Sequence, residues 1–105
     1  MFSHIDVISA IDDNIFAEGW CLILGVHAIE NLIAKIDNKS AHEISFDTRP
    51  HPDVNHHYPE GSLFSGFRVL IYHTDIQNIK IIELFGRIKD GQPSQPIEID
   101  ISKLE

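Results

Sequence analysis

Apolar and polar residues alternate along much of the chain, as they do in a β-strand with one buried face. The clearest case is the last stretch, where Ile97, Ile99 and Ile101 alternate with polar residues. Strands are predicted over residues 4–11, 15–24, 40–46, 67–73, 79–88 and 97–101. The stretches 15–24 and 79–88 are apolar on both faces, so we expect each of them in the centre of a sheet.

Residues 29–37 carry two patterns at once. The apolar residues at 29, 32, 33 and 36 have the spacing of one helix face, which favours a helix on local grounds. In the alternative, every second residue of a strand shares a face, and a tight Asp37-Asn38 turn then returns the chain.

The composition favours sheet over helix. Isoleucine occurs 18 times and leucine only 7 times in the 105 residues, and β-branched side chains fit a pleated surface better than a helix. About seven short strands predict an all-β fold, a two-sheet antiparallel sandwich of immunoglobulin-like shape. One short helical turn is predicted near 53–58, inside a proline-punctuated connection. We expect residues 1–105 to be a single domain from a longer multidomain chain.

The charge of the chain excludes two classes of partner. Its 16 acidic and 8 basic side chains give a net charge of -8, whereas a nucleic-acid or anionic-membrane surface requires a basic face. No apolar run approaches the roughly 20 residues of a membrane span, and the N-terminus has no signal-peptide pattern. We therefore expect a cytoplasmic protein without membrane insertion. The lone Cys21 is predicted to be a small buried hydrophobe, and no internal disulfide can form.

Five short motifs follow one another in a recognisable order: G-W-C-L at 19–22, I-D-N-K at 36–39, H-P-D-V at 51–54, Y-P at 58–59 and S-G-F at 65–67. This order resembles a small β-sandwich accessory module of bacterial multidomain glycosyltransferases and methyltransferase-like proteins of surface-glycan synthesis. The resemblance covers roughly residues 15–101 and implies that 29–37 is a strand. The chain departs from the module at His51, where an Arg is usual, and at Asn38, where a turn Gly is usual. Arg49 is a candidate substitute for the missing Arg.

The residues that match the module are assigned structural roles. We expect Asp53 to cap the helical turn, Gly66 to permit close packing where the loop enters a strand, and Phe67 to fill the core. The complete structural set is Gly19, Trp20, Pro52, Asp53, Val54, Pro59, Gly66 and Phe67.

Aromatic and imidazole side chains are the candidates for ligand binding. Aromatic faces suit the C–H surfaces of sugars, and Tyr58, in the loop, is the best placed of them. His56 and His57 are its neighbours for bonding hydroxyl groups. Trp20 is a further candidate, although its position in the middle of a strand favours core packing. Tyr72 is a weaker one.

His51, Asp53, His56 and His57 form a second candidate site, since imidazole and carboxylate groups can bind zinc. Adjacent histidines diverge on a helix and no cysteine supports them, so the preferred interpretation is a solvated polar loop. We expect no metal and no cofactor.

The sequence contains no nucleophile motif, phosphate-binding loop or dinucleotide fingerprint. We therefore expect a non-catalytic accessory module that docks a glycan or a neighbouring catalytic domain. The alternatives are a protein–protein module acting through a sheet edge at residues 97–101, with weak homodimerisation, and a small metal-dependent enzyme that uses the histidine loop.

Overall fold

The chain folds into two antiparallel four-stranded sheets that pack face to face. The computed structural model describes residues 2–23, 27–39, 41–72, 76–88 and 96–100. One sheet has the order β1 (Phe2–Ile11), β2 (Asn14–Leu22), β6 (Gly66–Ile71) and β5 (Ile44–Arg49); the other has the order β4 (Ala41–His42), β3 (Asn31–Ile36), β7 (Ile82–Arg87) and β8 (Ile97–Ile99). The helix α1 (Pro52–His57) and a short 3-10 helix (Ile76–Asn78) complete the described elements. The predicted all-β sandwich is confirmed.

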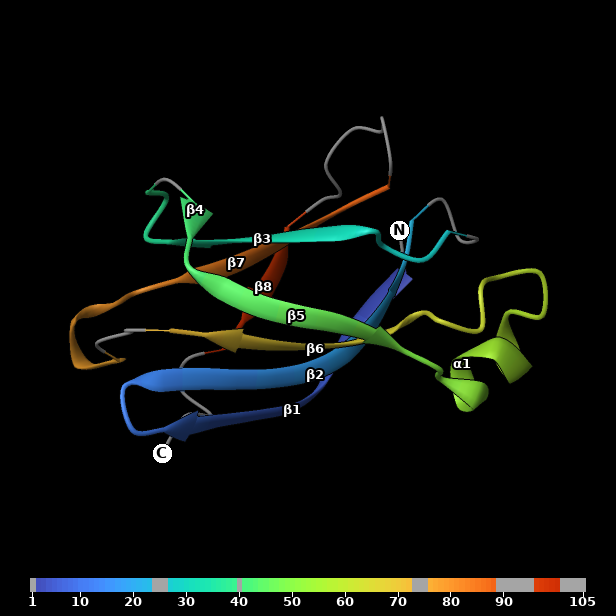
Figure 1. Cartoon of the computed structure of the whole chain (residues 1–105), viewed down its shortest axis with the longest axis horizontal. Helices are drawn as coiled ribbons and strands as arrows, with labels where there is room; N and C mark the ends of the chain where they lie inside the picture. The colour runs from blue at the N-terminus through green and yellow to red at the C-terminus, as the bar shows by residue number, and fades with distance from the viewer. Residues whose placement is uncertain (1, 24–26, 40, 73–75, 89–95, 101–105) are drawn as a thin grey trace.

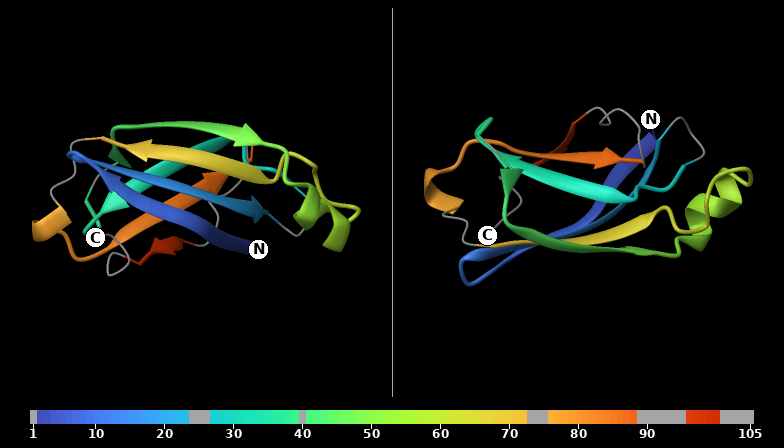
Figure 2. Two further views of the ribbon diagram at one scale, coloured as in Figure 1. Left: turned by 90° about the horizontal axis from the view of Figure 1, so that it is seen from below. Right: turned by 45° about the horizontal axis from the view of Figure 1, so that its top comes forward.

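The strand order is that of an immunoglobulin-type sandwich. In that architecture the first, second, fifth and fourth strands form one sheet, and the third, sixth and seventh form the other. The present chain has this arrangement with the two-residue β4 added beside β3. Figure 1 shows α1 at one end of the sandwich, beyond β5 and β6, and the two layers separate clearly in the views of Figure 2. As predicted, β2 and β7 are central strands and β8 is an edge strand.

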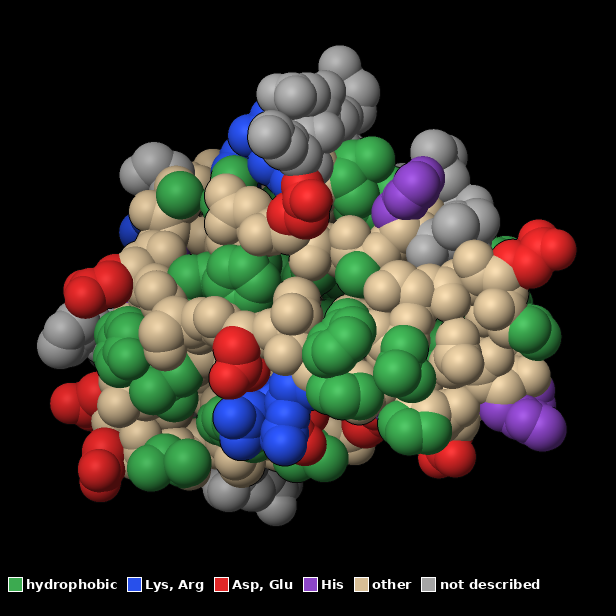
Figure 3. Space-filling view, turned by 45° about the vertical axis from the view of Figure 1, so that its right-hand side comes forward, with side chains coloured by type: hydrophobic (Ala, Val, Ile, Leu, Met, Phe, Trp, Pro, Cys, Tyr) green, Lys and Arg blue, Asp and Glu red, His purple; other side chains and the backbone are tan. Residues whose placement is uncertain are grey.

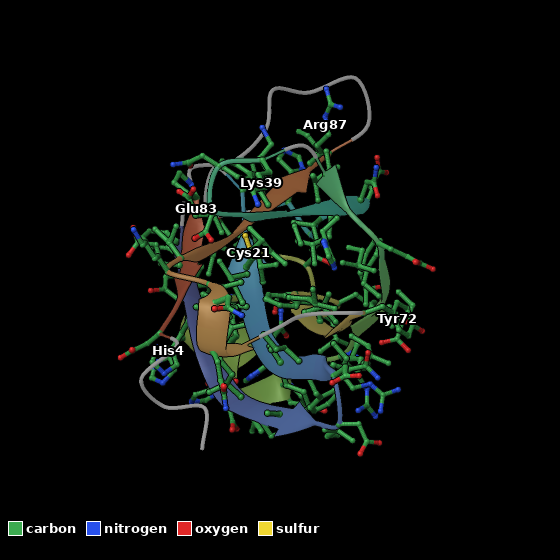
Figure 4. The ribbon with its side chains drawn as sticks, turned by 90° about the vertical axis from the view of Figure 1, so that its left-hand side faces the viewer. His4, Cys21, Lys39, Tyr72, Glu83 and Arg87 are labelled. Carbon is green, nitrogen blue, oxygen red and sulfur yellow. The ribbon has the colours of Figure 1, made fainter. Side chains whose placement is uncertain are left out.

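The core lies between the sheets and takes every second residue of each central strand. Ile15, Ala17 and Cys21 of β2 are fully buried, and Phe67 of β6 is 1 % exposed, as expected. Their counterparts in the other sheet are Leu32, Ala34, Ile36, Ile82, Leu84, Ile97 and Ile99. Figure 4 shows Cys21 between the two layers, where burial raises the pKa of its thiol to about 11. Cys21 is therefore a protonated core residue.

Residues 31–36, the middle of the ambiguous stretch 29–37, form the strand β3, so the strand alternative is correct and the helical spacing is coincidental. β3 pairs with β7 along its whole length, and Leu32, Ala34 and Ile36 all point into the core. The predicted tight turn follows it: Asp37 and Asn38 have φ of 53° and 61°, values that Asp and Asn accept more readily than most residues.

The strand predicted over 40–46 is wrong as a single element. β4 pairs with β3, whereas β5, which begins at Ile44, pairs with β6 in the other sheet. The chain thus changes sheets near Glu43, with Phe46 facing the core beside Val69. Alternation of apolar residues specifies a strand but not its partner, so the sequence could not place this change.

Several predicted strand boundaries also change: β1 begins at Phe2 rather than His4, and β7 spans Ile82–Arg87 rather than residues 79–88. β2 ends at Leu22, after which Ile23 makes an isolated bridge with His27. The predicted ends at Leu24, His73 and Ile101 lie outside the described residues.

Two of the motif glycines are required by close backbone contacts. A Cβ on Gly19 would lie 2.3 Å from the carbonyl oxygen of His4, because β1 bulges by one residue at Asp6 opposite this point. A Cβ on Gly66 would lie 2.9 Å from the carbonyl oxygen of Arg49. The predicted close packing at Gly66 is confirmed, and Gly19 has the same function on the β1 side.

Within the described residues, no helix has the length and apolar character needed to cross a membrane.

Candidate aromatic binding site

The candidate site is built on the loop that joins β5 to β6. α1 begins this loop with Pro52 in its first turn, where proline has no N–H to lose and a backbone angle suited to a helix. Val54 is 5 % exposed and anchors the helix to the sandwich. The Asn55 side chain donates to the Gly61 carbonyl at 3.0 Å, and the His51 backbone N–H donates to the Leu63 carbonyl at 2.8 Å. These contacts join the two arms of the loop and hold α1 against the sandwich.

The prediction that Asp53 caps α1 is wrong. Because Pro52 starts the helix, the capping position falls on His51, which makes no side-chain capping bond. Asp53 lies inside the first turn and is exposed. Its negative charge still suits this end of the helix, although it accepts no capping hydrogen bond.

Tyr58, at the end of α1, lies against two other aromatic rings. Its ring stacks on Phe2 of β1 with centroids 4.8 Å apart and an interplanar angle of 20°. The ring of Trp20 is 6.1 Å away at 42°. Both separations fall in the range of favourable aromatic pairs. Three segments that are distant in sequence therefore present their rings together.

Trp20 does not pack in the core as its position in the strand had favoured. Gly19 and Cys21 point inward, so Trp20 lies on the opposite face of β2, where it is half-buried. Tyr58 and His51 lie next to its ring there; the Trp20–His51 centroid distance is 6.5 Å. Trp20 thus lies beside Tyr58 and His51, outside the core, and its role in ligand binding stays a prediction.

A hollow of about 420 Å³ lies between these groups, and we call it the aromatic hollow. It is lined by Trp20, His51, Asp53, Val54, His57 and Tyr58. Its lining combines apolar rings with one carboxylate and two imidazoles, which is the usual composition of a small-ligand site. Figure 3 shows histidine and apolar side chains at the surface of this end of the molecule.

The His51 ring is held by a residue that does not line the hollow, Asp6. Its Nε2 lies 3.2 Å from Oδ2 of Asp6, the bulged residue of β1, and His4 Nε2 lies 3.8 Å from the other oxygen of the same carboxylate. Among the described residues, the buried Nδ1 of His51 has no hydrogen-bond partner. When Nε2–H donates to Asp6, this nitrogen carries a lone pair and is an acceptor.

Two other predicted residues lie away from the hollow. His56 is exposed on α1, where its ring lies edge-on to that of His57 at 5.9 Å. Tyr72 lies at the other end of β6 and bonds Ser45 through its hydroxyl. Arg49 forms an ion pair with Glu18 at 3.7 Å, and no ion pair joins it to Asp53 within the described ranges.

The four candidate metal ligands are not brought together. His51 points to Asp6, and His56 lies outside the hollow that His51, Asp53 and His57 line. In the part of the chain that the structure describes, no three His, Cys, Asp or Glu side chains are grouped closely enough to hold a metal ion.

Phe2 and Asp6 are the contributions that sequence reasoning missed. Phe2 contacts Tyr58, and Asp6 contacts His51, 45 positions further along the chain. Both contacts depend on how β1 lies beside the loop, and no local pattern carries that information.

A second, larger hollow differs from the aromatic hollow in having no Trp, Tyr or Phe in its lining. It measures about 650 Å³ and is lined by His27, Glu30 and Glu60 together with small and aliphatic residues, without Trp, Tyr or Phe. The aromatic hollow alone of these two offers ring faces to a ligand.

No protein-family model matches the chain, and neither a curated protein nor a solved structure does.

Proposed function

We propose that this chain is a non-catalytic accessory module that binds a saccharide in the aromatic hollow. The observation that carries the proposal is the packing of Tyr58 beside Phe2 and Trp20 at the edge of a cavity that also contains polar groups. Sugar rings have an apolar C–H face and a rim of hydroxyl groups. A site for them needs a ring face together with a few hydrogen-bonding side chains.

The polar residues of the hollow supply those hydrogen bonds. The Asp53 carboxylate accepts from hydroxyl groups, and the imidazoles of His51 and His57 donate or accept. With Asp53 in the lining and a chain charge of -8, an anionic saccharide is disfavoured. The ligand class is therefore a neutral saccharide.

The resemblance of the motif series supplies the biological context of this proposal. A module of that kind belongs to a larger bacterial transferase of surface-glycan synthesis, and it holds the glycan or contacts the neighbouring catalytic domain. The glycan is favoured here because the hollow is an open depression with the volume of a small-ligand site and with Trp20 and Tyr58 in its lining, whereas a domain interface is a larger surface.

The test uses the only tryptophan of the chain, Trp20, as its own probe. Titration with neutral hexose and N-acetylhexosamine oligosaccharides is expected to shift or quench its fluorescence, and the Tyr58→Ala variant is expected to lose the response. The Tyr72→Ala variant is the matched control, because Tyr72 follows the end of β6, whereas Trp20 pairs with Gly66 at the start of that strand. An unchanged spectrum at about 10 mM saccharide, well above a weak dissociation constant of about 1 mM, contradicts the proposal.

A further inference from the structure

Two edge strands face each other on the open side of the sandwich. β1 is the last strand of one sheet and β8 is the last strand of the other. They contact each other, and a hollow of about 370 Å³, which we call the edge groove, lies between them. Ile5 and Ile8 of β1 and Ile97 of β8 form its apolar part, and Asp6, Glu98 and Asp100 form its acidic part. Figure 4 shows His4, which also lines the groove, far from Tyr72.

The backbone at this groove is suited to an added strand. In the described part of the chain, β1 pairs only with β2 and β8 pairs only with β7. Each therefore presents one row of N–H and C=O groups that no other strand pairs, which is the surface that an extended peptide uses in β-augmentation. β8 has three residues and β1 bulges at Asp6, so the added ladder is short. A short ladder requires side-chain contacts to define its partner.

The side chains around the groove define a basic partner. Glu98 stands opposite Glu83 in the β7–β8 register, and Asp6 and Asp100 line the same groove. His4 is the basic side chain that faces them from β1. A second copy of the chain would bring the same carboxylates together, with a charge of -8 on each molecule. Lysine or arginine side chains on an incoming strand would instead be attracted to this acidic rim.

We propose that the edge groove binds an extended, basic peptide segment of a partner protein as an additional strand. Apolar residues of that segment face Ile5 and Ile8, which are only partly buried, and the alternate Lys or Arg residues face the acidic rim. The edge groove shares no lining residue with the aromatic hollow, and only the contact of Asp6 with His51 links the two, so the proposal does not rest on saccharide binding.

The experiment measures binding of three synthetic decapeptides to the full chain by backbone amide chemical shifts. The first peptide alternates Lys and Val. The second has the same sequence and charge except that two Val residues are replaced by Pro, and the third alternates Glu and Val. We expect the first peptide alone to bind, with shifts concentrated at residues 4–8 and 97–100. Proline removes backbone donors, so the second peptide separates strand addition from plain charge attraction.

Two charge-reversal variants of the protein complete the test. Glu98→Lys is expected to weaken binding of the Lys-Val peptide roughly threefold to tenfold, since it replaces one attraction by a repulsion. Glu60→Lys changes the net charge equally but lies in the other, larger hollow, and is expected to have little effect. Equal weakening by both variants, or equal binding of the proline peptide, overturns the proposal. Dimers whose amides at residues 97–99 are protected also overturn it, because they identify a second copy as the occupant.

Discussion

The two tyrosines occupy opposite ends of the sandwich and have opposite structural roles. Tyr72 follows β6 and is tied to the neighbouring segment by its polar groups: its hydroxyl bonds Ser45, its N–H donates to Glu43, and its carbonyl accepts from the His42 ring. Tyr58 instead presents its ring to other rings beside a cavity. The same residue type thus joins strands at one end and lines a site at the other. Its neighbours, rather than its chemistry, determine which.

Of the variants that affect one end of the sandwich and not the other, Gly19→Ala is expected to have the largest effect, and this effect is at the α1 end. The new methyl group would meet the backbone of β1 at 2.3 Å, so the strand that carries Phe2 and Asp6 must move. We expect a loss of about 2–3 kcal/mol in the free energy of unfolding, measured by urea denaturation.

Gly61→Ala is the matched control for that variant. Its methyl group would first meet the end of the Leu22 side chain at 2.9 Å, and a side chain can move where a strand backbone cannot. Equal stability losses for the two variants would show that the β1 bulge does not depend on glycine.

A smaller effect is expected from removing the Tyr58 ring. Tyr58→Ala loses the stacking on Phe2, which contributes about 1 kcal/mol, and it uncovers one side of Trp20. Thermal unfolding should record the first effect, and a shift of the Trp20 emission to longer wavelength should record the second. Tyr72→Ala should leave the emission unchanged; an equal shift would mean that the two ends are coupled.

The smallest expected effect concerns acid stability at the turn after β3. The Asp37 carboxylate accepts the backbone N–H groups of Ile81 and Lys80, each at 2.9 Å, and these bonds hold its pKa below the ordinary value of 3.8. The folded state therefore binds this proton less readily than the unfolded state. The resulting stabilisation is present above pH 3.8 and is lost as the pH falls through the lower, folded-state pKa. Asp37→Asn should flatten this part of the pH–stability curve.

Asp47 provides the comparison for this measurement. The Arg68 guanidinium, at 3.2 Å, likewise holds the pKa of Asp47 below its ordinary value, but here the partner is an exposed charge rather than backbone N–H groups. About 1 M salt should weaken the acid dependence that Asp47→Asn removes and leave more of the dependence due to Asp37. If salt abolishes both equally, the backbone hydrogen bonds of Asp37 do not cause its effect.

The strands could be predicted because their inward residues repeat with a period of two. This pattern located β2, β6, β7 and β8, and it identified Phe67 as a core residue. The tight turn at Asp37 and Asn38 was also predictable, since both residue types accept a positive φ.

The remaining errors concern choices that local pattern does not contain. The crossing at Glu43 depends on which sheet offers a partner. The capping error arose because Pro52 moved the start of the helix one residue upstream of Asp53. The position of Trp20 was ambiguous since β2 is apolar on both faces, and only the register with β1 and β6 decides which face is inward. The aromatic hollow itself required Phe2 and Asp6, whose contacts cross more than 40 residues.

The order in which the chain visits the two sheets has a consequence for folding. Each sheet is assembled from two separate pairs of strands, and the seams β2–β6 and β3–β7 join segments far apart in sequence. Such a topology has a high contact order, which is associated with slow and cooperative folding. During synthesis, β2 can pair with β6 only after residue 71 has left the ribosome. A chain truncated after β5 lacks β6, β7 and β8, so β2, β3 and β5 lose strand partners and their core isoleucines are exposed. We expect such a chain to aggregate rather than to form a stable half-domain.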